Sequence, residues 1–292
     1  MYATAFSAAG AVPEFEERWV DLALEEERAL VESLGGYTLE VAGARLVTHE
    51  RIPVPRFNFV QEVRVSGHRQ AAFFERALDH YFQRALRPSF RVGEPAPPHL
   101  DRSLRALGFK TRSEPHFLLL ALAPGRTAPP DPVRTRVARE PEVDQVVAFW
   151  ASEKEREELR RSVEVASRYP NPDEQLIPLL AERGGRPTAA ALLHAHRGVW
   201  AVHAVATRPD ARGQGVATAM VADALTQVIP AGSIVAMHAE STRLAGHLAK
   251  LGFREVRRSN VYDLPPEAEL SLPTVPATGG PRWRPPRSAR PA

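Results

Sequence analysis

The sequence predicts an α/β fold made of two similar halves, each a mostly antiparallel mixed sheet with helices on both faces. A length of 292 residues with 43% hydrophobic residues is enough for two compact domains. The segment Leu104–Phe109 recurs in nearly the same form as Leu248–Phe253. Each copy is typical of an amphipathic helix that ends at Gly and is followed by a strand beginning with Phe. Because the elements upstream of the two copies follow the same order, we expect a tandem duplication.

The elements of the first half are expected from helical or alternating apolar spacing. Upstream of the first repeated segment they are a helix at 14–34, strands at 37–41, 45–48 and 58–65, a helix at 70–86 and a strand at 89–92. The second half follows with a strand at 133–138, helices within 142–168, strands at 176–181, 188–196 and 200–207, a helix at 216–228 and a strand at 234–237.

Proline-rich segments set the expected domain boundaries. The segment 124–132 contains four prolines and no periodicity, as a linker does. From residue 265 to the end the chain is rich in Pro, Arg and Gly, which is typical of a disordered tail. We therefore expect a first domain at 13–123, a linker at 124–132, a second domain at 133–264 and a tail at 265–292.

Composition excludes several classes of protein. The chain has no cysteine, which rules out disulfides, thiolate metal sites and a catalytic thiol. The formal net charge is only +3 and the arginines are scattered, which argues against nucleic-acid binding. The N-terminus lacks the features of a signal peptide, and no apolar run approaches the roughly 20 residues of a membrane span. A cytoplasmic protein that does not bind membranes is expected.

One junction carries a binding signal. The stretch Val205–Ala217 leads from an apolar strand through a Gly-rich basic turn directly into a helix. Gly213 and Gly215 allow backbone amides to approach a ligand, and the positive end of the helix dipole lies at the same place. A diphosphate would fit there. The corresponding stretch of the first half, Ser66–Gln70, has a single Gly, so no diphosphate site is expected in that half.

This stretch resembles the signature of the GNAT acetyltransferase superfamily, Arg/Gln-x-x-Gly-x-Gly/Ala, at Arg212, Gly215 and Ala217. The spacing to Leu251-Gly-Phe253 and the order of elements over 133–264 fit the family as well. The first half fits only by element order and its Leu-Gly-Phe segment, as a degenerate copy would.

The resemblance implies an acetyltransferase that uses acetyl-CoA as co-substrate and a primary amine of a small molecule or peptide as acceptor. Backbone groups of the strand would bind the pantetheine arm and polarise the thioester carbonyl, and the amides of the turn would bind the diphosphate. Ser241 stands where the family commonly has an Asn that contacts the cofactor. The cofactor-binding positions expected are Val205, Ala206, Thr207, Arg212, Gly213, Gln214, Gly215, Val216, Ala217, Thr218 and Ser241.

A base must deprotonate the amine, whose pKa is near ~10. The string His203-Ala-Val-Ala-Thr207 resembles the serotonin N-acetyltransferase branch of the family, in which the equivalent histidine belongs to the proton-removing pathway. His203 is therefore the expected catalytic residue. If Arg197-Gly198 is a two-residue hairpin turn, His194 lies diagonal to His203 on one side of the sheet and would extend a proton path.

Other interpretations of these histidines stay open. They would equally fit a half-buried strand pair whose polar side chains touch solvent, or satisfied core histidines. No metal is expected there, because no Asp or Glu joins them in the sequence. The family's usual acid, a Tyr, is replaced by Leu248, and Tyr262 is a candidate substitute. A non-catalytic acyl-CoA-binding sensor is therefore the alternative function. The chain would be a monomer or a homodimer.

Overall fold

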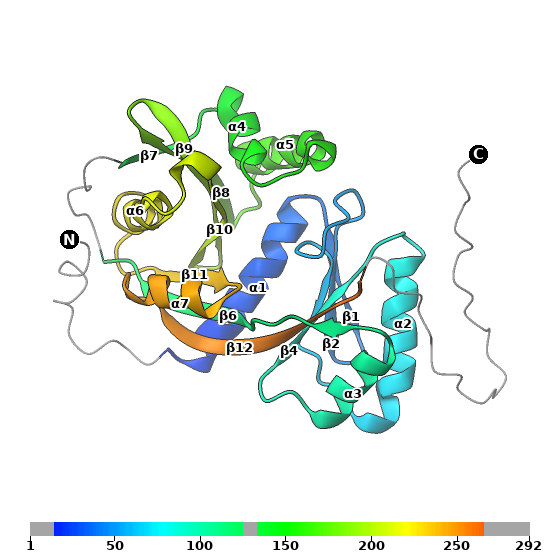
Figure 1. Cartoon of the computed structure of the whole chain (residues 1–292). Coiled ribbons are helices and arrows are strands. Elements are labelled where there is room, and N and C mark those ends of the chain that lie inside the picture. The colour runs from blue at the N-terminus through cyan, green and yellow to red at the C-terminus, as the bar shows by residue number, and fades with distance from the viewer. Residues whose placement is uncertain (1–14, 125–132, 266–292) are drawn as a thin grey trace, which may run out of the picture. The chain divides into compact units, whose positions relative to one another are not determined.

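The computed structural model describes residues 15–124 and 133–265, and within them the chain forms two compact units (Figure 1). Unit 1 contains the described residues up to Gly35 together with His116–Arg258, and unit 2 contains Gly36–Pro115 together with the residues from Ser259 onward. Both are mixed α/β structures with mostly antiparallel sheets flanked by helices, which confirms the predicted fold class. The expected linker and tail lie, except for Pro124 and Pro265, outside the described residues.

Unit 1 holds a mixed sheet in the order β12-β6-β11-β10-β9-β8-β7. Its helices are α1 (Glu17–Ser33), α4 (Val143–Ala148), α5 (Glu153–Arg168), α6 (Val216–Asp223) and α7 (Thr242–Ala249). Its strands are β6 (His116–Leu122), β7 (Val133–Val137), β8 (Glu174–Arg183), β9 (Arg186–His196), β10 (Val199–Thr207), β11 (Ile234–Ala239) and the start of β12 (Arg254–Asp263).

Unit 2 holds strands in the order β1-β2-β3-β4-β12, and β5 also pairs with β12. Its elements are β1 (Tyr37–Val41), β2 (Ala44–Thr48), β3 (Phe59–Gln61), α2 (Gln70–Phe82), β4 (Ser89–Gly93), α3 (Pro98–Ala106), β5 (Lys110–Thr111) and the end of β12. Aromatic side chains of α2 and β4, among them Phe73, Phe74 and Phe90, fill its core.

The same sequence of elements occurs in both halves of the chain. In each, three strands with antiparallel pairing lead to a helix, and the next strand pairs in parallel with the third: β3 with β4 around α2, and β10 with β11 around α6. The repeated Leu-Gly-Phe segments also close alike. Gly108 and Gly252 have φ of +86° and +87°, and the next amide donates to the carbonyl of Leu104 at 3.0 Å and of Leu248 at 3.2 Å, as in a Schellman C-cap.

The compact units differ from the consecutive segments 13–123 and 133–264 expected from the sequence. Helix α1 and strand β6 precede residue 124, yet both belong to unit 1, and the end of β12 belongs to unit 2. Strand β6 belongs to unit 1 because its residues from Phe117 to Ala121 are apolar and buried, and because it pairs with β11 from Phe117–Ala239 to Leu122–Ile234. A strand buried on both faces belongs inside a sheet.

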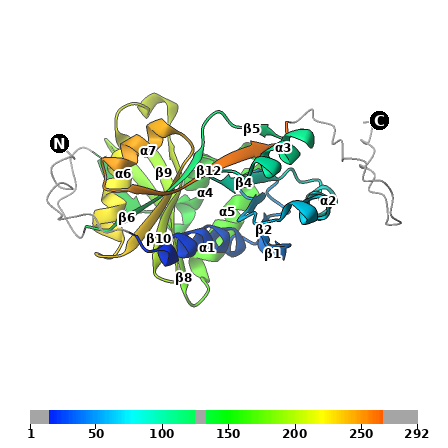
Figure 2. The ribbon, with the colours of Figure 1, turned by 90° about the horizontal axis from the view of Figure 1, so that it is seen from below.

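The sheet of unit 1 has two different faces, because successive side chains of a strand point to opposite sides. On one face Leu118, Leu120, Val199, Ala201, Ile234 and Ala236 pack with Ala23 and Leu24 of α1. On the other face Leu119, Val202, Val235 and Met237 pack with Val216 and Met220 of α6 and Leu248 of α7. Figure 2 shows α1 and α7 on opposite sides of these strands.

Some expected elements are shorter in the structure. The strand expected at 58–65 ends at Gln61, because Glu62 takes the left-handed conformation with φ of +55°. The helix expected at 70–86 ends at Phe82. The helix expected at 216–228 is α-helical to Asp223 and continues as a π-helical turn over Ala224–Val228. No helix within residues 15–124 and 133–265 has the length and apolarity to span a membrane.

Candidate active site

Strands β10 and β11 separate in the middle of the sheet of unit 1. Their parallel pairing covers Val199–Val202 of β10, whereas β10 itself continues to Thr207. The pairing of β10 with β9 is irregular between His203 and Ala206, and Ala204 has φ of +51°. A β-bulge of this kind bends the strand that carries it. The expected cofactor contacts Val205, Ala206 and Thr207 therefore lie on the part of β10 that has left β11.

The Gly-rich turn follows directly and leads into α6. Gly213 and Gly215 have φ of +75° and +76°, and Gly215 is the N-cap residue of α6. A Cβ added at either position would meet no atom within 4 Å, so both glycines face open space. The amides of Val216, Ala217 and Thr218 open the helix and have no acceptor within it. The turn therefore has the conformation of an anion cradle at a helix N-terminus.

Side chains of the turn stabilise its conformation. The Nε of Arg212 donates to the carbonyl of Thr207 at 3.2 Å, and the Nε2 of Gln214 donates to the carbonyl of Asp210 at 2.9 Å. Arg183 also donates to the side chain of Gln214. The corresponding stretch of unit 2 is a 3-10 turn, Gly67–Arg69, in which no described residue has positive φ. The two halves thus differ at this turn, as expected from the single Gly of Ser66–Gln70.

Five histidines share the face of the sheet that α1 covers; one of them, His196, contacts Glu25 of α1, and the other four lie near Glu26 and Glu27. His203 and His238 lie two residues beyond Ala201 and Ala236, His116 lies two before Leu118, and His194 pairs directly with Ala201. Since Ala201, Ala236 and Leu118 pack against α1, the alternation of side chains directs all four imidazoles toward that helix. Helix α1 meets them with two buried carboxylates, Glu26 and Glu27.

Glu26 joins two of these histidines. It is 0% exposed, and its Oε1 lies 2.8 Å from Nδ1 of His194 and 2.9 Å from Nε2 of His203. Burial alone would raise the pKa of this carboxyl. The charge of His203 and the hydrogen bonds from both imidazoles have a larger, opposite effect, and together they lower the pKa from 4.5 to about 2. Glu26 is therefore ionised and accepts both bonds.

This arrangement fixes the orientation of His203. An ionised carboxylate only accepts hydrogen bonds, so Nε2 of His203 carries the proton that is donated to Glu26. In the neutral imidazole Nδ1 is then the nitrogen that can take up a proton. A histidine held by a buried carboxylate in this way has the geometry of a general base with its orienting partner.

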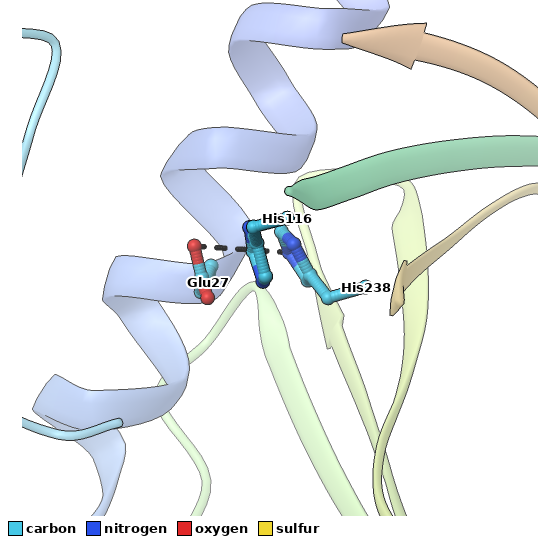
Figure 3. Close-up of side chains that lie close together, drawn as sticks. All are labelled: Glu27, His116 and His238. Atoms are coloured by element: carbon cyan, nitrogen blue, oxygen red, sulfur yellow. Dashed lines mark ion pairs between the residues drawn. The ribbon is translucent and has the colours of Figure 1, made fainter. Parts of the chain in front are cut away.

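A second group continues the row of imidazoles. The rings of His116 and His238 are stacked, with centroids 4.8 Å apart and an interplanar angle of 15°, and the ring of His238 lies 6.3 Å from that of His203. The Nε2 of His238 lies 3.7 Å from Oε2 of Glu27 (Figure 3). Imidazoles from β6, β11 and β10 thus lie side by side under α1.

The hairpin predicted from the sequence is confirmed, and with it the relation of His194 to His203. Arg197 and Gly198 both have positive φ, His196 pairs with Val199 and His194 with Ala201. The expectation that no carboxylate joins the histidines was wrong, because Glu26 bonds to both His194 and His203.

Sequence reasoning missed Glu26, Glu27, His116 and His238. A signal for the two carboxylates was present: in the helix Glu17–Ser33, positions 26 and 27 fall on the same face as Ala23 and Leu30, which are both buried. Charged residues on an apolar helical face are rarely buried without a partner.

The remaining site positions have other partners. The Oγ of Ser241 caps α7 by accepting from the amide of Leu244 at 3.2 Å. Leu248 is buried in the core of unit 1. Tyr262 belongs to unit 2, where its hydroxyl donates to Asp101 at 2.9 Å and where burial and the Asp101 carboxylate raise the pKa of the phenol to about 12.

The chain is similar to known proteins both in part of its sequence and in its fold. The model of the acetyltransferase (GNAT) family matches residues 143–253. A search of curated proteins found no match. A GCN5-related N-acetyltransferase from Kribbella flavida is similar in structure, with 16% identity and a TM-score of 0.58 over 84% of this chain and 96% of that chain.

Two further solved structures share the fold. A GCN5-related N-acetyltransferase from Sphaerobacter thermophilus has 15% identity and a TM-score of 0.52, covering 78% of this chain and 79% of that one. A tandem GNAT protein from the clavulanic acid biosynthesis pathway has 15% identity and a TM-score of 0.51, covering 77% and 79%. At these identities the likeness is one of fold.

Proposed function

We propose that this chain, whose residues 143–253 match the model of the acetyltransferase (GNAT) family, is an N-acetyltransferase of that superfamily and uses acetyl-CoA. The acceptor would be a primary amine of a small molecule or peptide. The proposal is supported chiefly by one arrangement in unit 1: β10 leaves β11 after Val202, carries His203 bonded to Glu26, and ends in the Gly-rich turn of α6.

The coenzyme would bind along this path. The turn amides from Gly213 to Thr218, with the dipole of α6, are suited to the diphosphate. Backbone groups of Val205 to Thr207 would hold the pantetheine arm and the thioester oxygen, and so stabilise the charge that develops on that oxygen. Arg212, Gln214 and Ser241 would border the site. Because the stretch from Ser66 to Gln70 lacks such a turn, unit 2 would bind no coenzyme there.

His203 would act as the base. Its Nδ1 accepts a proton from the protonated amine, and the carboxylate of Glu26 stabilises the imidazolium that results. The neutral amine then attacks the thioester carbonyl, a C–N bond forms and the C–S bond breaks. The nitrogen loses its second proton as the amide forms, and the coenzyme A thiolate gains one, so the protons balance. Leu248 cannot supply that proton, so turnover would lack general-acid assistance worth roughly 10²–10⁴ in rate.

The test is release of free coenzyme A from acetyl-CoA with a panel of aminoglycosides, polyamines, amino acids and peptide N-termini. With the best amine, His203→Ala should lower kcat by roughly 10²–10⁴ while leaving the Kd for acetyl-CoA unchanged. Glu26→Gln keeps the size and the hydrogen bond but removes the charge, so its loss of kcat should be smaller. His247→Ala, at an exposed position of α7, is the matched control.

The outcomes separate the alternatives. If kcat is unchanged in both His203→Ala and Glu26→Gln, His203 is not the base. Tight binding of acetyl-CoA with no turnover of any amine would favour the non-catalytic acyl-CoA-binding sensor. Melting temperatures of the variants show whether a loss of turnover reflects unfolding.

A further inference from the structure

Three side chains beside the Glu26–His203 pair have no part in the proposed acetyl transfer. Glu27 of α1, His116 of β6 and His238 of β11 each bring one ligand atom to a common place, and these atoms lie within 4.8 Å of one another (Figure 3). They are the one group of this kind within residues 15–124 and 133–265. We propose that Glu27, His116 and His238 bind a divalent transition-metal cation of the zinc class.

The distances are close to those of a metal site. Three atoms that lie within 4.8 Å of one another always share a point no farther than about 2.8 Å from each of them. Zinc binds imidazole nitrogen and carboxylate oxygen at roughly 2.0–2.2 Å, so each donor has to move inward by about 0.8 Å at most. Small side-chain rotations supply a movement of that size.

The donor set points to the zinc class of cations. Two imidazoles and one carboxylate are a common ligand set of zinc sites that keep a fourth position open. Imidazole donors favour zinc, copper, nickel and iron over magnesium and calcium, which prefer oxygen ligands. The chain contains no cysteine, so no thiolate site elsewhere competes for such an ion.

The surroundings favour a bound cation. Glu27 is 8% exposed and His116 is 9% exposed, so the carboxylate lies where an ionised group needs a compensating charge. The neighbouring imidazoles His194 and His203 are already bonded to Glu26 and are therefore not counted among the ligands. The ion would lie next to the proposed base His203 and its partner Glu26, and it would share no ligand with them.

One rearrangement is required. The rings of His116 and His238 are stacked at 15°, and a nitrogen lone pair lies in the plane of its ring, so at least one ring must turn to share an ion. The torsion that turns a histidine ring is broad, which keeps this rotation inexpensive. Once bound, the ion would connect α1 to β6 and β11 and hold the helix over the face that carries His203.

Metal binding can be measured on the full chain without coenzyme or amine, so its result is independent of acetyl transfer. Protein stripped with a chelator is titrated calorimetrically with Zn²⁺, Co²⁺ and Mg²⁺. We expect one equivalent of Zn²⁺ to bind and to raise the melting temperature, Co²⁺ to bind with visible absorption bands of low coordination number, and Mg²⁺ not to bind.

Variants locate the ion. Glu27→Gln, His116→Asn and His238→Asn should each weaken Zn²⁺ binding by more than the roughly 10–100-fold that loss of an outer-shell partner costs. His247→Asn, which changes an exposed histidine of the same unit, should bind like the unaltered protein. Glu27→Gln is nearly isosteric, so it decides the matter if a histidine variant fails to fold. Absence of a stoichiometric Zn²⁺ site, or equal affinity in all four variants, overturns the proposal.

Discussion

Replacement of Gly215 by Ala tests whether the turn before α6 is the diphosphate site. Gly215 has φ of +76°, and an added Cβ would meet no protein atom within 4 Å. The methyl group therefore causes no clash within the protein and projects into the open space where the diphosphate is proposed to bind. The substitution should therefore have two independent effects. It should lower the free energy of unfolding, and it should raise the Kd for acetyl-CoA.

The conformational cost can be worked out in advance. A residue with a Cβ in the left-handed region costs about 1–2 kcal/mol relative to Gly. With no steric term to add, the free energy of unfolding should fall by that amount, or roughly 2–8 °C in melting temperature for a protein of this size. Gly232 is a matched position in unit 1, with φ of +78° and no atom within 4 Å of an added Cβ. Gly232→Ala should lose the same stability.

Coenzyme binding then separates the two variants. Titration calorimetry with acetyl-CoA should show at least a tenfold rise in Kd for Gly215→Ala, equivalent to about 1.4 kcal/mol, because the methyl group displaces the diphosphate from the amides. Gly232→Ala should change Kd by less than about twofold. Equal Kd values in the two variants, together with equal losses of stability, would refute the assignment of the turn as the diphosphate site.

Two further predictions concern pH and the last strand. The hydrogen bonds from Arg136 and from the amide of Arg139 lower the pKa of Glu142 from 4.5 to about 2, so this ion pair stabilises the fold above pH 4.5 and is lost as the pH falls toward 2. Urea unfolding should find Glu142→Gln less stable at pH 7 and equally stable near pH 2; a difference independent of pH would contradict this. Tyr262→Phe loses the bond to Asp101 and should lower the free energy of unfolding by about 1 kcal/mol with turnover unchanged within twofold. A tenfold drop in turnover would instead make Tyr262 the missing acid.

Sequence reasoning succeeded where structure is determined locally. The hairpin at Arg197-Gly198 and the C-caps at Gly108 and Gly252 depend on residues within one turn of chain, and all are present in the structure. The strand, turn and helix around Gly213 and Gly215 were predicted for the same reason. Left-handed positions leave a clear signal, because few residues other than Gly adopt them at low cost.

The partners of His203 could not be predicted in the same way. Glu26 is 177 residues away in the sequence, and its contact with His203 depends on α1 packing on a sheet that consists mostly of strands from the other half of the chain. The separation of β10 from β11 likewise results from a bulge at Ala204, whose side chain gives no sign of a left-handed backbone. Both features arise from tertiary packing, which a periodic pattern does not encode.

Because elements are exchanged between the halves, we expect that residue 133 does not begin a segment that folds by itself. Strand β6 lies between β11 and β12 and buries Phe117, Leu118, Leu119 and Leu120 in the two cores of unit 1. At about 1.5–3 kcal/mol for each large side chain, these four contribute roughly as much as the 5–15 kcal/mol by which a whole domain is stable. A fragment of residues 133–265 lacks β6 and α1, so it should show no cooperative unfolding transition in near-UV circular dichroism. Cooperative unfolding of that fragment would show that the second half of the chain folds without the elements that complete its sheet here.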